Sequence, residues 1–269
     1  MNSANVIRVT ASLVLLSVSA SSVALAEKII TVKPEYGGEL NFILLKPDHP
    51  KAAVVLFPGG NGNLRLNDHG EIRRQSFLVR DRDEFVDRGF MVAVFNPPSG
   101  MEDLLRPYRM SEMHSQDIRA VVEHLKETAN VPVWLIGLSR GTYSAANGAI
   151  RLKGLLSGII LTSTPTKSRK KYTIYATHPN GVIDMELGSI KVPVLVVANK
   201  TDSCAGSPAS NAEKLSKAFT VAPKTALIIF DGEEETKQDN CRWVSQHQYS
   251  GFEGKVVDAI ADFIKASAK

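Results

Sequence analysis

The feature of the sequence that most constrains its fold is a Gly-x-Ser-x-Gly motif at residues 137–141, with Ser139 at its centre. A short run of strand-forming residues leads into the motif, and an alanine-rich segment typical of a helix follows it directly. This is the layout of a nucleophile elbow, in which a serine lies on a sharp turn between a strand and a helix. We expect glycine on both sides because a side chain there would collide with neighbouring backbone. We also expect a strained backbone at Ser139.

Taken by itself the motif is weak evidence, because three fixed positions filled by common residues match by chance on the order of 0.1 times in a chain of this length. The alternative is a glycine-rich turn that exposes an ordinary serine. The catalytic interpretation therefore requires a strand before Ser139, a helix after it, and an acid and a histidine further along the chain.

The rest of the chain alternates predicted strands with predicted helices. The strands are expected at residues 39–45, 52–57, 90–95, 133–138, 158–162, 192–198 and 225–230, and the helices at 75–88, 113–128, 142–152, 209–219 and from 250 onward. Ser250 and Glu253 are predicted to form a capping box on the last helix. The alternation indicates an α/β fold, with a mostly parallel central sheet covered by helices on both faces. Such sheets bind ligands at the carboxyl ends of their strands.

Residues 1–26 are predicted to be a secretory signal peptide. Arg8 precedes an apolar run, and an Ala-x-Ala cleavage site ends at Ala26. The apolar run is short and rich in serine, so we expect cleavage and no stable membrane insertion afterwards; an uncleaved anchor is the alternative. Residues 27–269 are then predicted to form one domain in a periplasmic or secreted protein.

The formal charge of +4 is mild for a chain of 269 residues. The sequence has no recognisable nucleic-acid module and no cluster of aromatic residues suited to stacking on bases, so we expect no nucleic-acid partner. With 43% apolar residues the chain can bury a full core. The sequence leaves the oligomeric state open.

Residues 166–189 interrupt the alternation of strands and helices. One interpretation is a solvated basic loop. The other is a short lid insertion that favours anionic substrates or surfaces. The segment carries four basic and two aromatic side chains: Lys167, Arg169, Lys170, Lys171, Tyr172 and Tyr175.

A serine hydroxyl needs a base to take its proton, and the base needs a carboxylate to orient it. Downstream of an elbow these partners follow in the order acid, then histidine. Asp202 fits the acid because it comes directly after a predicted buried strand. Asp231, after the next strand, is the rival, and Asp184 in the 166–189 segment fits less well.

The base is expected in the loop before the last helix, where His247 lies. His178 is the weaker rival. The remaining four histidines all precede Ser139 and are not favoured. His49 and His69 are in the wrong order for the base, and His114 and His124 fall on a predicted helix as surface or internally satisfied residues.

The two cysteines support this choice of acid and base. An even number of cysteines in an exported chain predicts a disulfide, Cys204–Cys241, with two free buried thiols as the alternative. Cys204 is close in sequence to Asp202 and Cys241 to His247. The bridge would therefore join the loops of the proposed acid and base, which favours Asp202 over Asp231.

The oxyanion of the reaction needs two hydrogen-bond donors. One is the backbone N–H of Arg140, directly after the serine. The other is expected in the glycine-rich loop at 57–63, where Gly60 is the best placed donor and Asn61 the next. A phosphate-binding or dinucleotide loop is a weaker interpretation, because the loop lacks the corresponding motifs.

On these residues, nearly all of the mature region resembles the α/β-hydrolase superfamily. The resemblance implies a serine hydrolase, most often acting on carboxylic esters, with no metal or organic cofactor. Because the predicted lid is short, we expect an open site suited to small or exposed acyl substrates. Dienelactone hydrolases are similar in size and in their minimal lid, but they use cysteine at the elbow. Many members of the superfamily carry His-Gly where this chain has Pro58-Gly59, so the identity of the second oxyanion donor stays open.

Other functions use the same constellation. Acyl transfer and peptide cleavage need the same serine, histidine and aspartate. An exported binding protein that keeps the fold without turnover is the alternative from a different class. Relatives without activity usually lose a member of the triad, and all three candidates are present here.

Overall fold

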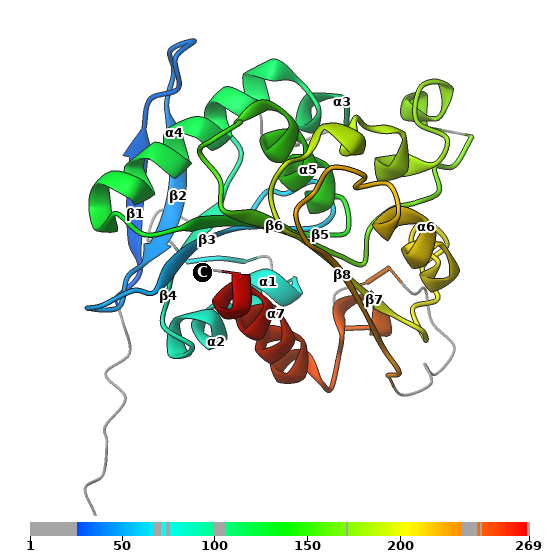
Figure 1. Ribbon diagram of the computed structural model, residues 1–269. Helices are drawn as coiled ribbons and strands as arrows, with labels where there is room; N and C mark the ends of the chain where they lie inside the picture. The colour runs from blue at the N-terminus through cyan, green and yellow to red at the C-terminus, as the bar shows by residue number, and fades with distance from the viewer. Residues whose placement is uncertain are drawn as a thin grey trace, which may run out of the picture.

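The centre of the molecule is an eight-stranded sheet with helices on both faces, seen in the computed structural model in Figure 1. The structure describes residues 26–66, 71–73, 76–98, 106–170, 172–232, 241–242 and 244–267. In chain order the strands are β1 (Lys28–Val32), β2 (Leu40–Leu45), β3 (Ala52–Phe57), β4 (Phe90–Phe95), β5 (Val133–Leu138), β6 (Gly158–Thr162), β7 (Val194–Asn199) and β8 (Thr225–Phe230).

The order of the strands in the sheet is β1-β2-β4-β3-β5-β6-β7-β8. β2 is antiparallel to both of its neighbours, and the other pairs are parallel. After β3 the chain first forms β4 on one side and then β5 on the other. Because of this reversal, the carboxyl ends of β3 and β5 lie side by side and a crevice forms between the loops that follow them. Open α/β sheets bind ligands in such a crevice.

The helices divide between the two faces of the sheet (Figure 1). One face is covered by α3 (Arg106–Arg109), α4 (Glu112–Ala129), α5 (Gly141–Arg151) and α6 (Ala212–Ser216), and the other by α1 (Phe77–Arg80), α2 (Arg82–Asp87) and α7 (Glu253–Ser267). The described residues also form five short 3₁₀ helices: η1 (Thr173–Ala176), η2 (Gly181–Asp184), η3 (Leu187–Ser189), η4 (Ala209–Asn211) and η5 (Gln246–Gln248).

Each face has its own apolar core because successive side chains of a strand point to opposite faces. In β3, Val55 packs into the core under α4 and α5, whereas Val54 and Leu56 pack into the core under α1, α2 and α7. All six residues of β3, β4, β5 and β7 are buried, which explains their continuous apolar sequences. The predicted α/β fold with helices on both faces is confirmed.

Some elements differ from the sequence predictions. Strand β1 was not predicted; it is a five-residue edge strand in which Thr31 interrupts the apolar residues and no residue is buried. The helix predicted at 75–88 is two short helices that meet at Asp81. The helix predicted at 209–219 is a 3₁₀ turn followed by α6, which ends at Ser216.

The predicted capping box at the last helix is wrong. Tyr249 and Gly251 have positive φ angles of 59° and 92°, so the chain around Ser250 is not helical and α7 begins at Glu253. The Glu253 carboxylate accepts a hydrogen bond from the Gly251 N–H instead, at 2.9 Å.

The predicted signal peptide falls outside the described residues as far as Leu25. Within the described part of the chain, no helix combines the length and the apolar character needed to cross a lipid bilayer.

Candidate active site

Ser139 lies on the sharp turn between β5 and α5. Its φ angle is +51°, in the left-handed region that is uncommon for residues other than glycine, and its N–H donates to the carbonyl of Thr162 at 2.9 Å. A Cβ atom added to Gly141 would lie 2.0 Å from the carbonyl oxygen of Phe57, and one added to Gly137 would lie 2.6 Å from backbone atoms of the turn. Both glycines are therefore required by close backbone approach, and the strain at the serine is held in place by the surrounding packing.

The glycine-rich loop after β3 lies directly against this turn. A Cβ atom added to Gly59 would be 3.3 Å from the Cβ of Ser139. Gly60 lines the same cavity as Ser139, with a φ angle of +63°. Asn61 is not among the residues that line this cavity, and within the described chain its buried side-chain oxygen has no hydrogen-bond partner. Of the two residues predicted to supply the second oxyanion donor, the geometry favours Gly60.

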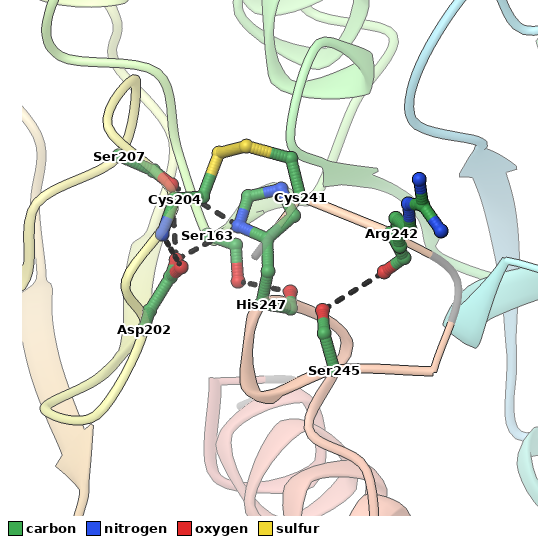
Figure 2. Close-up of a disulfide and its surroundings, with 8 residues drawn as sticks. All are labelled: Ser163, Asp202, Cys204, Ser207, Cys241, Arg242, Ser245 and His247. Atoms are coloured by element: carbon green, nitrogen blue, oxygen red, sulfur yellow. Dashed lines mark hydrogen bonds and ion pairs between the residues drawn. A yellow bond between two sulfur atoms is a disulfide. The ribbon is translucent and has the colours of Figure 1, made fainter. Parts of the chain in front are cut away.

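Asp202 and His247 meet at the same edge of the sheet (Figure 2). The Nδ1 atom of His247 lies 2.8 Å from Oδ2 of Asp202, and both side chains are 2% exposed. Ser207 donates to the same carboxylate oxygen at 2.9 Å, and the Cys204 N–H donates to Oδ1 at 2.8 Å. A carboxylate that accepts from Nδ1–H leaves Nε2 as the unprotonated nitrogen of a neutral ring, which is the form that can accept a proton.

The loop that carries His247 is fixed by contacts from two strands. The Ser163 hydroxyl, just after β6, donates to the carbonyl of His247 at 2.9 Å, and the Ser163 N–H donates to the Tyr249 hydroxyl at 3.0 Å. The Tyr249 hydroxyl in turn donates to the carbonyl of Val197 in β7 at 3.1 Å. Asn199, at the end of β7, donates to the carbonyl of Gln246 at 2.9 Å.

These contacts place the histidine loop beside the turn that carries the serine. Leu138 and Thr162 are paired in β5 and β6, and Ser139 and Ser163 are the residues that follow them. The hydrogen bonds among the described residues do not include one between the Ser139 hydroxyl and the ring of His247.

The supporting residues Ser163, Asn199, Ser207 and Tyr249 were not singled out by the sequence analysis. Asn199 has a weak signal, because it is a polar residue at the end of an apolar strand that precedes the predicted acid. The other three have no signal in the sequence, because their roles depend on segments that meet only in the folded chain.

The rival acids and bases lie elsewhere. Asp231 is 69% exposed and pairs with Lys200 at 3.0 Å. Asp184 accepts hydrogen bonds from Asn180, and the Nδ1 atom of His178 lies 2.8 Å from the hydroxyl of Thr177.

The predicted disulfide between Cys204 and Cys241 is confirmed, with an S–S distance of 2.05 Å (Figure 2). It joins the loop after β7 to the segment that leads to His247. By distance alone Asp202, Cys204 and His247 could be a metal-ligand set. The sulfur of Cys204 is bonded to Cys241, however, so it cannot serve as a thiolate ligand.

A buried polar network lies behind the glycine-rich loop. Arg109 is fully buried and donates to the carbonyl of Pro58 at 3.1 Å and to the hydroxyl of Ser144 at 2.8 Å. His114 lies between this hydroxyl, 2.9 Å from its Nε2, and the Asp117 carboxylate, 3.4 Å from its Nδ1. The network fixes the carbonyl of Pro58, and with it the loop that contains Gly59 and Gly60.

Ser144, His114 and Asp117 are the residue types of a catalytic triad, but all three are fully buried, so we assign them a structural role. Burial lowers the pKa of His114, and this effect of burial outweighs the opposing effect of Asp117. The network is therefore built around a neutral imidazole. Tyr36 also hydrogen-bonds to Asp117, and burial together with this hydrogen bond raises the pKa of Tyr36 to about 12.

A cavity of about 300 Å³ opens beside Ser139, and neither Asp202 nor His247 is among the described residues that line it. Its lining comes from the glycine loop, the elbow, the 166–189 segment and the disulfide loops: Gly60, Ser139, Arg140, Pro165, Lys167, Arg169, Tyr172, Cys204, Gly206, Ser207 and Cys241.

No family model matches the sequence, and no curated protein matches it either. Solved structures do match. An esterase of Pyrococcus furiosus is 16% identical with a TM-score of 0.63, over 94% of this chain and 97% of the esterase. An acylaminoacyl peptidase of Pyrococcus horikoshii is 13% identical with a TM-score of 0.64, over 91% of this chain and 42% of the peptidase. A fungal esterase from Rhizomucor miehei is 14% identical with a TM-score of 0.64, over 91% of this chain and 83% of the esterase. The chain has the α/β-hydrolase fold.

Replacing both cysteines with alanine is expected to lower the free energy of unfolding by about 4 kcal/mol. The bridge closes a sequence separation of 37, and chain entropy gives a loop of that length roughly this stabilisation. Urea titration of the wild type and the double variant measures the difference. Wild-type protein in a reductant should match the variant, and an unchanged unfolding midpoint would contradict the prediction.

The stability of the protein is expected to fall as the pH decreases below about 6.5. The unfolded chain protonates His114 near that pH, whereas the folded chain, with a lowered pKa, does not. Above pH 6.5 the histidine is neutral in both states, so its stabilising effect is complete there. Below it, the loss is up to about 1.4 kcal/mol per pH unit.

Thermal unfolding from pH 8 to pH 5 tests this, with His114→Gln as the comparison. The amide keeps a polar group near Ser144 but does not titrate. The variant should be less stable at pH 8 and should lose less stability on acidification than the wild type. Parallel pH profiles would show that other groups cause the loss.

Proposed function

We propose that this protein is an exported serine hydrolase that cleaves carboxylic esters through an acyl-enzyme. The observation that carries the proposal is the buried contact of 2.8 Å between Asp202 and His247, at the sheet edge where Ser139 is held with a φ angle of +51°. The α/β-hydrolase fold and the esterases among its structural neighbours support it.

In the first half of the reaction, Ser139 Oγ attacks the carbonyl carbon of the ester and Nε2 of His247 takes its proton. The carbonyl oxygen becomes an oxyanion, which accepts hydrogen bonds from the backbone N–H groups of Arg140 and Gly60. The C–O bond of the ester then breaks, and the alcohol leaves with the proton from His247. The acyl group stays bonded to Ser139.

In the second half, water attacks the acyl carbon while His247 accepts one of its protons. The bond to Ser139 Oγ breaks, the proton returns to the serine, and the carboxylic acid is released. Asp202 stays ionised throughout, holds Nδ1–H and stabilises the imidazolium that forms in each half.

The proposed substrate is a small or exposed acyl ester, because the cavity beside Ser139 has a volume of only about 300 Å³. The proposed roles require no cofactor, nucleic acid or membrane. Acyl transfer and peptide cleavage would use the same groups. Acyl transfer differs in the nucleophile that takes the acyl group from Ser139, and peptide cleavage differs in the bond that is broken. A disulfide in the chain is compatible with the proposed export.

A tagged fluorophosphonate is expected to label the purified protein at Ser139. The reagent phosphonylates activated serines, so Ser139→Ala should abolish the labelling seen by gel fluorescence and by peptide mass. Ser216→Ala, on the surface of α6, is the matched control and should keep it. No labelling of the wild type between pH 6 and pH 9 would refute the proposed function.

Asp202→Asn is expected to lower kcat for a 4-nitrophenyl ester by about 10³–10⁴-fold, because an amide cannot hold the same tautomer or stabilise the imidazolium. Asp231→Asn should change kcat less than about twofold, since Asp231 is an exposed partner of Lys200. Equal or reversed losses would overturn the assignment of the acid.

A further inference from the structure

The cavity beside Ser139 is lined by three basic side chains, those of Arg140, Lys167 and Arg169. Among the residues that the structure describes, none that lines this cavity carries a carboxylate. Cavities lined by charge of one sign raise the local concentration of ligands of the opposite sign. The lining therefore favours a substrate with negative charge.

The three basic groups are not neutralised by ion pairs within the described chain. The ion pairs found among the described residues include none of them. The carboxylate of Asp202, whose loop contributes Cys204, Gly206 and Ser207 to the cavity lining, already accepts hydrogen bonds from His247, Ser207 and the Cys204 N–H. It is 2% exposed and so has no free oxygen to offer to a cation.

The 166–189 segment is hydrogen-bonded to the loop that follows the proposed acid, Asp202. The N–H groups of Thr166 and Lys167 both donate to the carbonyl of Gly206, at 2.9 and 3.1 Å. The N–H of Ser168 donates to the carbonyl of Pro179 at 2.8 Å, so the chain between Lys167 and Arg169 is anchored on both sides. The two side chains themselves are exposed and line the cavity.

Arg140, the residue directly before α5, also lines the cavity. Its guanidinium carbon lies 5.8 Å from the centre of the Tyr172 ring, a cation–π contact across the cavity lining. This contact holds the guanidinium of Arg140 over the ring of Tyr172, which lines the same cavity. Arg140 and the 166–189 segment thus present their cations to one space, which also contains the proposed nucleophile.

We propose that this cavity selects esters that carry an anionic oxyacid group, with Lys167 and Arg169 as its binding residues and Arg140 as the third cation. This inference rests on the proposed function, because it names the substrate class of the same site. Guanidinium groups pair with carboxylates and phosphates in a bidentate geometry, and an ammonium group adds a point charge. A carboxylate on the acyl chain is the simplest such substrate.

The test compares charged and neutral esters of matched shape. The 4-nitrophenyl monoester of adipic acid is compared with 4-nitrophenyl heptanoate, which has a neutral end of similar size. Two further esters put the charge on the alcohol: 4-acetoxybenzoate and 4-acetoxyphenyl phosphate, each compared with phenyl acetate. Each kcat/KM is divided by the rate of hydroxide-catalysed hydrolysis, which removes differences in intrinsic reactivity.

The wild type is expected to prefer the anionic ester in at least one pair, and the preference should fall in 0.5 M NaCl because exposed charges are screened. The pair that shows it identifies the group recognised, acyl carboxylate, alcohol carboxylate or phosphate. The double variant Lys167→Ala/Arg169→Ala should lower the ratio of anionic to neutral kcat/KM about fivefold, as expected for exposed ion pairs. Lys170→Ala, on the same segment but outside the cavity lining, is the matched control and should keep the ratio.

The outcomes separate this inference from the proposed function. Labelling of Ser139 and turnover of neutral esters, without preference for an anionic one, would overturn the inference and leave the proposed function standing. An unchanged ratio in the double variant would also overturn it, because the preference would then come from elsewhere. Absence of both labelling and turnover would refute the proposed function and this inference together.

Discussion

The arrangement of the candidate site depends on a buried carboxylate. Removing an ionised carboxylate from water is costly unless its oxygens are hydrogen-bonded. Asp202 meets this requirement with donors from three places: the backbone of Cys204, the hydroxyl of Ser207 and the ring of His247. The first two come from its own loop, whereas the third comes from a residue 45 positions later in the chain. The disulfide from Cys204 then ties the same loop to the segment that carries the histidine.

Two strained turns lie at the same edge of the sheet, and neighbouring residues hold each of them in place. Ser139 and Ser163 follow paired residues of neighbouring strands, and both have positive φ angles, +51° and +44°. Each is held by its neighbours: Ser139 by the carbonyl of Thr162, and Ser163 by contacts to the histidine loop and to β7. Conformations of this kind persist when the surrounding structure over-determines them. One turn presents the proposed nucleophile and the other fixes the backbone of the proposed base.

The sequence was sufficient to predict the parts of the fold that depend on local pattern. Buried strands such as β3 and β7 are continuous apolar runs, the elbow is a motif, and the disulfide follows from two cysteines. Edge strand β1 was missed because a half-exposed strand has no such run, and Tyr249 because its hydroxyl acts between β6 and β7. The break at Asp81 and the late start of α7 are set by tertiary packing and positive φ angles, which helical periodicity does not encode.

The position of α7 has a consequence for how the protein is made. This helix, with α1 and α2, covers one whole face of the sheet, and it follows His247 directly in the chain. During synthesis from the N-terminus, the serine and its glycine loop are complete before His247 and α7 emerge. Until those residues are translated, the nascent polypeptide lacks the apolar cover that α7 supplies and has no imidazole at the elbow. Burial of that face and assembly of the three proposed catalytic groups then depend on the same closing event.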